Sequence, residues 1–216
     1  MKTTASLLRP LVLLGLVVSL LAGCADTKLS RSWTAPGVTQ LKFKKVVVIA
    51  LAANRDFNRK MAESAVVNQM TRITAVPSYE LMPGLTSIKD RDDVLKMIKD
   101  SGADGVITLR LASADSRVSY GASGNLPMDY MSFSGYYGSV YDVTGYYLDD
   151  GGRSIVTDRI LSIETNIYDA HTGKLVWSGL TTSTKDANNP GSVPALILEV
   201  GKTLRAKMES EGLIQK

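Results

Sequence analysis

Hydrophobic and polar positions follow two periods in the first half of the chain, and together they predict a β-α-β-α-β arrangement. A continuous apolar run over residues 46–51 is typical of a central strand covered on both faces. Apolar residues at helical spacing predict a helix over about residues 56–70. A second strand is expected over residues 73–81, interrupted near Pro77, and a third over residues 105–111. Parallel strands joined by right-handed helical crossovers are the expected arrangement.

The helix between the second and third strands has recognisable ends. Asp90 is suited to the N-cap, and Asp92 and Asp93 suit the positive end of the helix dipole. Lys99 lies toward the other end, and Gly102 can adopt the left-handed conformation that terminates a helix.

The second half of the chain predicts an antiparallel hairpin followed by one helix. Residues 159–168 alternate, residues 169–173 form a turn in which Gly173 is free to take a positive φ, and residues 174–184 return. Ser192 can cap a last helix, with Pro194 in its first turn. The predicted fold class is therefore α/β with an α+β tail. Its β-α-β-α-β half, hairpin and C-terminal helix all pack on one mixed sheet.

The N-terminus predicts a lipoprotein export signal, residues 1–23, that is cut before Cys24. Lys2 and Arg9 precede an apolar run, as the n-region and h-region of a signal require. This run is shorter than the roughly 20 apolar residues that span a bilayer. It ends in Leu-Ala-Gly-Cys at residues 21–24, which resembles the bacterial lipobox, whose cysteine thiolate takes a diacylglyceryl group. The alternatives are a plain secretory signal with a chance cysteine and a buried anchor helix.

The lipobox resemblance implies acylation of Cys24, palmitate included, and attachment to a membrane. One acyl chain binds only marginally, whereas the three chains that the resemblance implies hold firmly. Asp26 stands one place later than the aspartate that favours inner-membrane retention in enteric bacteria. This favours the outer membrane, facing the periplasm, although the sorting rule differs between bacterial groups. Residues 24–42 are expected to be the lipidated cysteine and a polar tether, followed by a single domain at residues 43–216.

Composition is that of an ordinary globular protein. Hydrophobic residues make up 44% and charged residues 21%, and the 193 residues left after cleavage suffice for one domain with a real core. The net charge of +4 includes Lys2 and Arg9, so the mature chain is near +2 and no nucleic-acid binding is expected. Because Cys24 is the only cysteine, stability in an oxidising periplasm must come from packing rather than disulfides.

Residues 117–152 differ in composition and are expected to be an insertion or a long loop. They hold seven of the nine tyrosines, with many glycines and few aliphatic residues. Tyrosine gives a large contact area at low entropic cost, and Gly and Ser add adaptability. The candidate contact surface, for an envelope protein or a cell-wall glycan, comprises Tyr120, Tyr130, Phe133, Tyr136, Tyr137, Tyr141, Tyr146 and Tyr147. A surface loop without chemistry and a membrane-inserting hairpin of a ring assembly are the alternatives.

Motifs for catalysis or metal binding are absent from the sequence. His171 is the only histidine, and its place in the hairpin turn predicts that it is solvated. No GxSxG, HExxH or Cys/His cluster occurs, so no catalytic residue, metal or cofactor is predicted. Asp158 and Glu164 are the carboxylates that an alternative hydrolase would use.

Two segments carry a resemblance to known envelope proteins. Ser-Gly-Ala-Asp-Gly-Val-Ile at residues 101–107 and Tyr-Asp-Ala-His-Thr-Gly-Lys-Leu-Val-Trp at residues 168–177 resemble those of uncharacterised proteobacterial envelope lipoproteins. More distantly, they are similar to the periplasmic domain of the curli-secretion lipoprotein and the N-terminal domain of the Tol-system propeller protein. The resemblance covers roughly residues 44–210 without the insertion, and it implies a fold and a compartment rather than catalytic residues.

Together these features predict a non-enzymatic lipoprotein, anchored to the outer membrane, that acts as a binding or assembly module in the cell envelope. An envelope hydrolase and a subunit of a pore-type oligomer are the alternatives. The sequence leaves the partner and the oligomeric state open.

Overall fold

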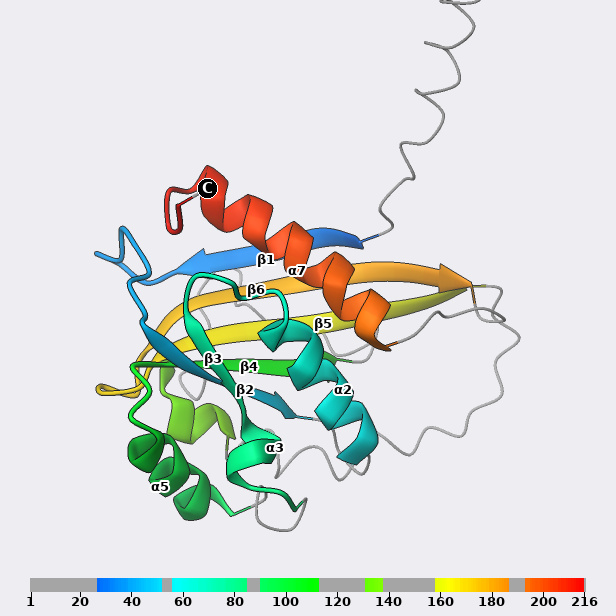
Figure 1. Cartoon of the computed structure of the whole chain (residues 1–216). Helices are drawn as coiled ribbons and strands as arrows, with labels where there is room; N and C mark the ends of the chain where they lie inside the picture. Colours follow the sequence, from blue (N-terminus) through cyan, green and yellow to red (C-terminus); the bar gives the residue numbers. More distant parts are fainter. Residues whose placement is uncertain are drawn as a thin grey trace, which may run out of the picture.

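A six-stranded mixed sheet organises the structure, with helices on both of its faces (Figure 1). The computed structural model describes residues 27–51, 56–84, 90–112, 131–137, 158–186 and 193–215. The strands lie in the order β1-β6-β5-β4-β2-β3. This confirms the predicted α/β class with one mixed sheet.

The first half of the chain forms the parallel part of the sheet. Strand β2 (Lys45–Leu51) lies between β3 (Thr74–Pro77) and β4 (Gly105–Ala112) and is parallel to both. Helix α2 (Asp56–Val67) connects β2 to β3, and helix α5 (Arg91–Ser101) precedes β4. The predicted β-α-β-α-β half is therefore present.

The second strand is shorter than the sequence analysis expected. Strand β3 ends at Pro77, and residues 78–81 form the short helix α3 (Ser78–Leu81) instead of continuing the strand. Proline has no N–H to donate to a sheet ladder, so a strand pairing ends readily at this residue.

The ends of α5 are those expected from the sequence. The Asp90 carboxylate accepts hydrogen bonds from the backbone N–H groups of Asp92, at 2.9 Å, and Asp93, at 3.2 Å. At the other end Gly102 has a φ of 67°, in the left-handed region. Neighbouring residues thus provide hydrogen-bond partners for backbone groups at both ends of the helix.

The predicted hairpin is also present. Strands β5 (Asp158–Asp169) and β6 (Leu175–Asp186) pair antiparallel. In the turn, Asp169 Oδ1 accepts hydrogen bonds from the backbone N–H of His171 and Thr172, and Gly173 has a φ of 66°. The C-terminal helix α7 (Val193–Ser210) follows the hairpin in sequence, as predicted.

One strand lies where the sequence analysis placed a tether. Strand β1 (Thr27–Thr34) pairs antiparallel with β6 and forms an edge of the sheet. The Thr27 and Ser183 hydroxyl oxygens lie 2.6 Å apart across this pairing, as do those of Ser30 and Thr182. The expected tether over residues 24–42 is therefore corrected at residues 27–34, which are part of the folded sheet.

The core has two layers, one on each face of the sheet. Alternate residues of β2 face opposite sides, and all six from Val46 to Leu51 are at most 4% exposed. Helices α2 and α7 cover one face, where the core contains Val48, Ile107, Ile167, Trp177, Ile197, Val200 and Leu204. The opposite face is covered by α5 and a short helix over residues 133–137, and its core contains Val47, Ile49, Val94, Ile98, Val106, Phe133, Tyr137 and Tyr168.

Trp177 fixes the local packing of β6 because its ring lies over Gly179. A Cβ atom at Gly179 would lie only 2.2 Å from Trp177 Cη2. Trp177 is fully buried, so its ring has no free space into which it could retreat. Residue 179 must therefore lack a side chain for the ring to occupy this place.

Gly179→Ala is expected to lower the free energy of unfolding by about 1–3 kcal/mol, the usual cost of overpacking a core. Chemical denaturation of the two proteins measures this difference. In the Trp177→Phe background the smaller ring should reduce the cost of the alanine, as a double-mutant cycle would show. An additive cycle would contradict the proposed clash.

Candidate functional site

A chain of polar side chains crosses β4, β5 and β6 on the sheet face that α5 covers. Arg110 donates to Glu164 Oε2 through Nε, at 2.9 Å, and also through Nη2. Asn166 Nδ2 donates to Glu164 Oε1 at 3.1 Å, and Ser178 Oγ donates to Asn166 Oδ1 at 2.6 Å. Glu164, Asn166 and Ser178 are fully buried. These contacts join three adjacent strands through four side chains.

This polar chain is built to hold strands in register rather than to carry out a reaction. Both oxygens of Glu164 already accept charged or amide donors, and the Ser178 hydroxyl proton is directed at Asn166. A nucleophilic serine instead needs a neighbouring base that accepts its proton. A shift of any of the three strands by one residue would turn its polar side chain to the other face of the sheet and break these hydrogen bonds. The network therefore specifies the register of the strands.

The hydrolase alternative requires two carboxylates that converge, and the fold separates them. Asp158 and Glu164 lie six positions apart on β5. At about 3.3 Å per residue this is about 20 Å along the strand. Paired carboxylates of glycoside hydrolases lie roughly 5–9.5 Å apart, so these two cannot act on one bond.

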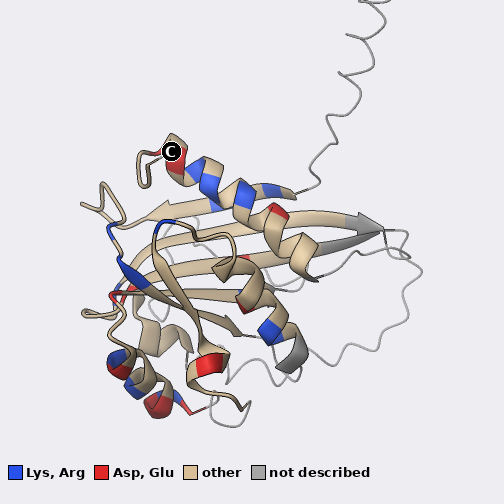
Figure 2. Ribbon diagram, viewed as in Figure 1, with Lys and Arg blue, Asp and Glu red and all other residues tan. Residues whose placement is uncertain are grey.

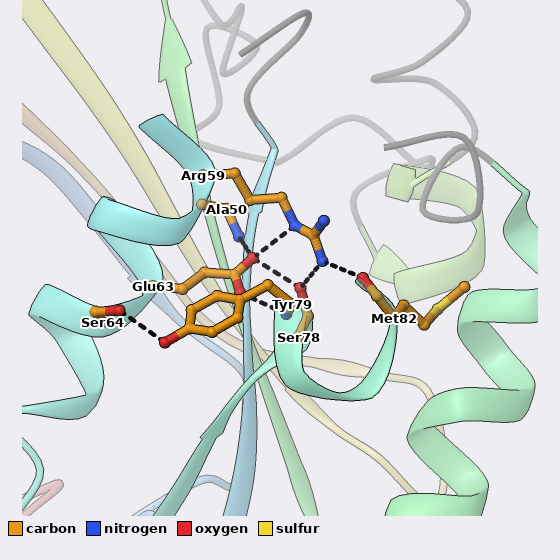
Figure 3. Close-up of polar contacts among 7 residues, drawn as sticks. All are labelled: Ala50, Arg59, Glu63, Ser64, Ser78, Tyr79 and Met82. Carbon is orange, nitrogen blue, oxygen red and sulfur yellow. Dashed lines mark hydrogen bonds and ion pairs between the residues drawn. The ribbon is translucent and has the colours of Figure 1, made fainter. Parts of the chain in front are cut away.

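A second buried network centres on Glu63 of α2 (Figure 3). Its Oε1 accepts hydrogen bonds from Ala50 N at 3.0 Å, Arg59 Nε at 3.2 Å and Ser78 Oγ at 2.7 Å. Its Oε2 accepts from Tyr79 N at 3.0 Å. The carboxylate thus joins β2, α2 and the start of α3.

Glu63 takes over backbone pairing at the point where β3 ends. The last register pair of β2 and β3 is Val48 with Pro77. Two residues further along each segment, the backbone N–H groups of Ala50 and Tyr79 both donate to Glu63. Pro77, the N-cap of α3, forms no side-chain hydrogen bond to that helix. The carboxylate therefore satisfies two N–H groups that would otherwise be buried without a partner.

Arg59 balances the charge of this carboxylate inside the protein. Its Nη2 donates to Met82 O at 2.9 Å and to Ser78 Oγ at 3.1 Å, and both side chains of the ion pair are 0% exposed. Burial raises the pKa of Glu63, while hydrogen bonds from Ala50 N and Ser78 and the charge of Arg59 act to lower it. Because the pKa of Glu63 is higher in the folded state than in the unfolded state, protonation of Glu63 favours folding. The stability gained in this way is fully present below the unfolded-state pKa. That contribution is lost as the pH rises through the folded-state pKa.

This buried pair was not predicted from the sequence. Arg59 and Glu63 are four positions apart, a spacing that is typical of solvated ion pairs on a helix surface. One feature of the sequence could have indicated their burial. Arg59 precedes the buried Ala62 by three positions, so the two residues lie on the same side of the helix. What buries them is the α3 segment, whose helical conformation was not expected.

The tyrosine-rich insertion is fixed to the sheet by three aromatic residues. Phe133, Tyr136 and Tyr137 are 3%, 0% and 1% exposed, and all three belong to the core beside Tyr168. The Phe133 ring centroid lies 5.5 Å from those of Tyr137 and Tyr168, and the Tyr136 and Tyr168 centroids are 5.9 Å apart. Phe133 N also donates to Gly173 O, in the hairpin turn, at 2.8 Å.

These three residues correct the predicted contact surface. Positions i, i+3 and i+4 of a helix share a face, and here that face is buried against the sheet. Phe133, Tyr136 and Tyr137 are therefore core residues and are not available to a partner. Outside the described residues lie the remaining candidates, namely Cys24, Tyr120, Tyr130, Tyr141, Tyr146 and Tyr147.

The hairpin turn borders a hollow of about 420 Å³ that is lined partly by Lys42, Asp104, Asp169 and His171. Asp104 accepts hydrogen bonds from the backbone N–H of Lys44 and Lys45. Partial burial works to raise the pKa of Asp169, but hydrogen bonds from Thr172 and His171 outweigh it and lower that pKa. His171 is exposed, as predicted. Both carboxylates are thus engaged in holding loops and turns.

Within the described ranges, no group of three or more His, Cys, Asp or Glu side chains is arranged to hold a metal ion. Among the helices that the structure describes, none combines the length and apolar character needed to cross a bilayer.

Comparisons with known proteins find distant structural likenesses only. No protein-family model and no curated protein sequence matches the chain. A PelC dodecamer from Paraburkholderia phytofirmans aligns with a TM-score of 0.43 and 10% identity, over 88% of this chain and 99% of that one. A variant of that protein gives a TM-score of 0.41 and 13% identity, over 81% and 93%. Lipoprotein GNA1162 from Neisseria meningitidis gives 0.40 and 13%, over 77% and 98%.

Similarity of this degree assigns neither a family nor a function to the chain. The resemblance of its sequence to the curli-secretion and Tol-system domains stays a prediction.

Glu63→Ala is expected to lower the free energy of unfolding by about 3–5 kcal/mol, because it leaves Arg59 as a buried charge without its counter-ion. Denaturant titration measures the loss. Glu80→Ala removes the same charge from an exposed position of α3 and should change stability by no more than about 0.5 kcal/mol. Equal effects of the two substitutions would contradict the role given to Glu63.

Proposed function

We propose that this chain is a lipid-anchored module of the bacterial envelope that binds or assembles with a partner rather than catalysing a reaction. The observation that carries the proposal is the position of β1. The folded sheet begins at Thr27, three residues after the lipobox cysteine Cys24. Acylation of Cys24 would therefore hold the sheet itself at the membrane, without a long tether between them.

The chemistry of the described residues supports a non-catalytic role. The two buried carboxylates, Glu63 and Glu164, are each paired with an arginine and serve to join secondary-structure elements. The carboxylates of the hydrolase alternative are separated along β5, and His171 lies alone in an exposed turn. A binding or assembly function needs none of these groups to be free.

The partner surface is proposed to be the tyrosine-rich insertion. Its central helix, residues 133–137, is anchored in the core, and five tyrosines precede or follow that helix in sequence, namely Tyr120, Tyr130, Tyr141, Tyr146 and Tyr147. Aromatic rings suit both protein interfaces and stacking on sugar rings. The proposed partner is an envelope protein or a cell-wall glycan, with the outer membrane as the proposed site.

Cys24→Ser is expected to abolish lipidation, because a hydroxyl cannot replace the thiolate as the acyl acceptor. Metabolic labelling with a palmitate analogue and fractionation of membranes measure the effect. Ala25→Ser keeps the cysteine and should label as the native chain does. Undiminished labelling of Cys24→Ser would refute lipid anchorage at this residue.

Replacing Tyr120, Tyr130, Tyr141, Tyr146 and Tyr147 by serine is expected to abolish partner binding while leaving the fold intact. Deleting the whole insertion is a poorer test, because it also removes Phe133, Tyr136 and Tyr137 from the core. Binding is measured by co-sedimentation with purified peptidoglycan and by pull-down from solubilised envelopes, and folding by circular dichroism.

A double variant, Leu95→Ser with Leu111→Ser, serves as the control, since it removes exposed apolar side chains elsewhere on the domain. It should bind as the native protein does. If the five-serine variant retains the same material as the native chain, the insertion is not the partner surface.

A further inference from the structure

The first residue of β1 is fixed to helix α7. Thr27 Oγ1 donates to Glu199 Oε2 at 3.1 Å, and Thr203 Oγ1 donates to the Thr27 carbonyl oxygen at 3.5 Å. With Ser183 as a third partner, Thr27 is buried at 5% exposure. Figure 1 shows β1 and α7 side by side at one edge of the sheet. Any lipid on Cys24 is therefore attached to the domain at the edge formed by β1 and α7, here named the anchor edge.

The length of chain before Thr27 limits how far this edge can lie from the membrane. Three residues span at most about 11 Å when fully extended. Electrostatic interactions with a charged surface persist over a Debye length of about 8 Å at physiological salt. The opposite edge, at β3, is five strand spacings away, which is about 24 Å. The anchor edge is therefore held close enough to reach the lipid headgroups, whereas the β3 edge is held well beyond their electrostatic range.

The anchor edge is positively charged and the opposite edge is not, as contact with anionic headgroups requires. Strand β1 has Lys28 and Arg31 and no acid, and α7 has three basic and two acidic residues, so the anchor edge carries a net charge of +3. Lys202 and Arg205 are exposed on α7, and Lys28 and Arg31 are exposed on the sheet face opposite α7, so basic side chains flank this edge on both faces. Figure 2 shows basic residues along both elements. At the other edge, the charges of α5 cancel and α3 adds Glu80, which leaves a net charge of −1.

Helix α7 also presents an apolar side chain to solvent. Leu198 is 43% exposed, and it lies four positions before Lys202 and seven before Arg205, on the same side of the helix. An exposed leucine beside basic residues is the pattern by which a helix lies on a lipid surface.

We infer that the anchor edge docks edge-on, through β1 and the adjoining exposed residues of α7, on the anionic headgroup surface of the membrane to which Cys24 is attached. The inference rests on the proposed lipid anchorage. Docking fixes the orientation of the domain, with the β3 edge pointing away from the bilayer. Each basic residue at such a surface strengthens the contact by about fivefold.

The orientation can be measured with the full lipidated protein, because the thiol of its only cysteine is consumed by the lipid. An introduced cysteine is then the single site for a fluorescent label. Ala206→Cys places the label on the exposed side of α7, and Leu95→Cys places it on the exposed side of α5 as a matched control. The protein is reconstituted in phosphatidylethanolamine vesicles with or without phosphatidylglycerol, and a quencher attached to lipid headgroups reports contact.

The label at residue 206 should be quenched in vesicles that contain phosphatidylglycerol, and the label at residue 95 should not. Lys28→Glu with Lys202→Glu should reduce quenching at residue 206 by fivefold or more. Lys60→Glu with Lys99→Glu makes the same change in charge on α2 and α5 and should leave it unchanged.

Three results would each overturn the docking. They are equal quenching at both positions, no quenching at residue 206, and quenching at residue 206 that changes neither with phosphatidylglycerol nor with charge reversal. Palmitate labelling separates this failure from that of the proposed function. A lipidated chain whose residue 206 stays unquenched refutes the docking alone, and a chain that is never lipidated refutes both.

Discussion

The structure depends on one constraint, which is that β2 is apolar on both faces and must be covered on both. Helix α2 covers one face and α5 the other, and the connections that place them there produce the parallel half of the sheet. Covering β2 also buries its backbone beyond the end of β3, where Ala50 has no partner on the β3 side. Glu63 accepts that N–H, and the charge of Glu63 in turn requires Arg59. The buried ion pair is thus a consequence of a strand pairing that stops at Pro77.

Most of the fold could be predicted because its signals are local. The apolar run of β2, the capping residues of α5 and the turn before Gly173 each act through neighbours in sequence. Strand β1 has no such signal: its residues are largely polar, and it is an edge strand whose partner β6 lies about 150 residues away. Whether a polar, alternating segment pairs or stays a tether depends on that distant strand.

The site was harder to predict because burial decides what each side chain does. The composition of residues 117–152 suggested a surface, yet Phe133, Tyr136 and Tyr137 meet Tyr168 in the core. Their helical spacing was visible in sequence, but the apolar face they would meet was not. The same holds for Arg59 and Glu63, whose spacing suits a solvated pair. In both cases the residue types and their helical spacing could be read from the sequence. The distant segment that buries them, β5 in one case and α3 in the other, could not be derived from the local pattern.

The two proposed surfaces are compatible because they use different residues: docking uses β1 and α7 at the sheet edge, and the insertion is anchored through residues 133–137. Helix α7 packs on the face that contains Val48 and Ile167, whereas the helix at residues 133–137 packs on the opposite face, beside Val106 and Tyr168. A domain that docks through β1 and α7 therefore keeps the anchor of the tyrosine-rich insertion on the face opposite α7. Membrane contact and partner contact need not compete for the same residues. Docking would then restrict the orientations in which the insertion meets a partner, which lowers the entropic cost of forming that contact.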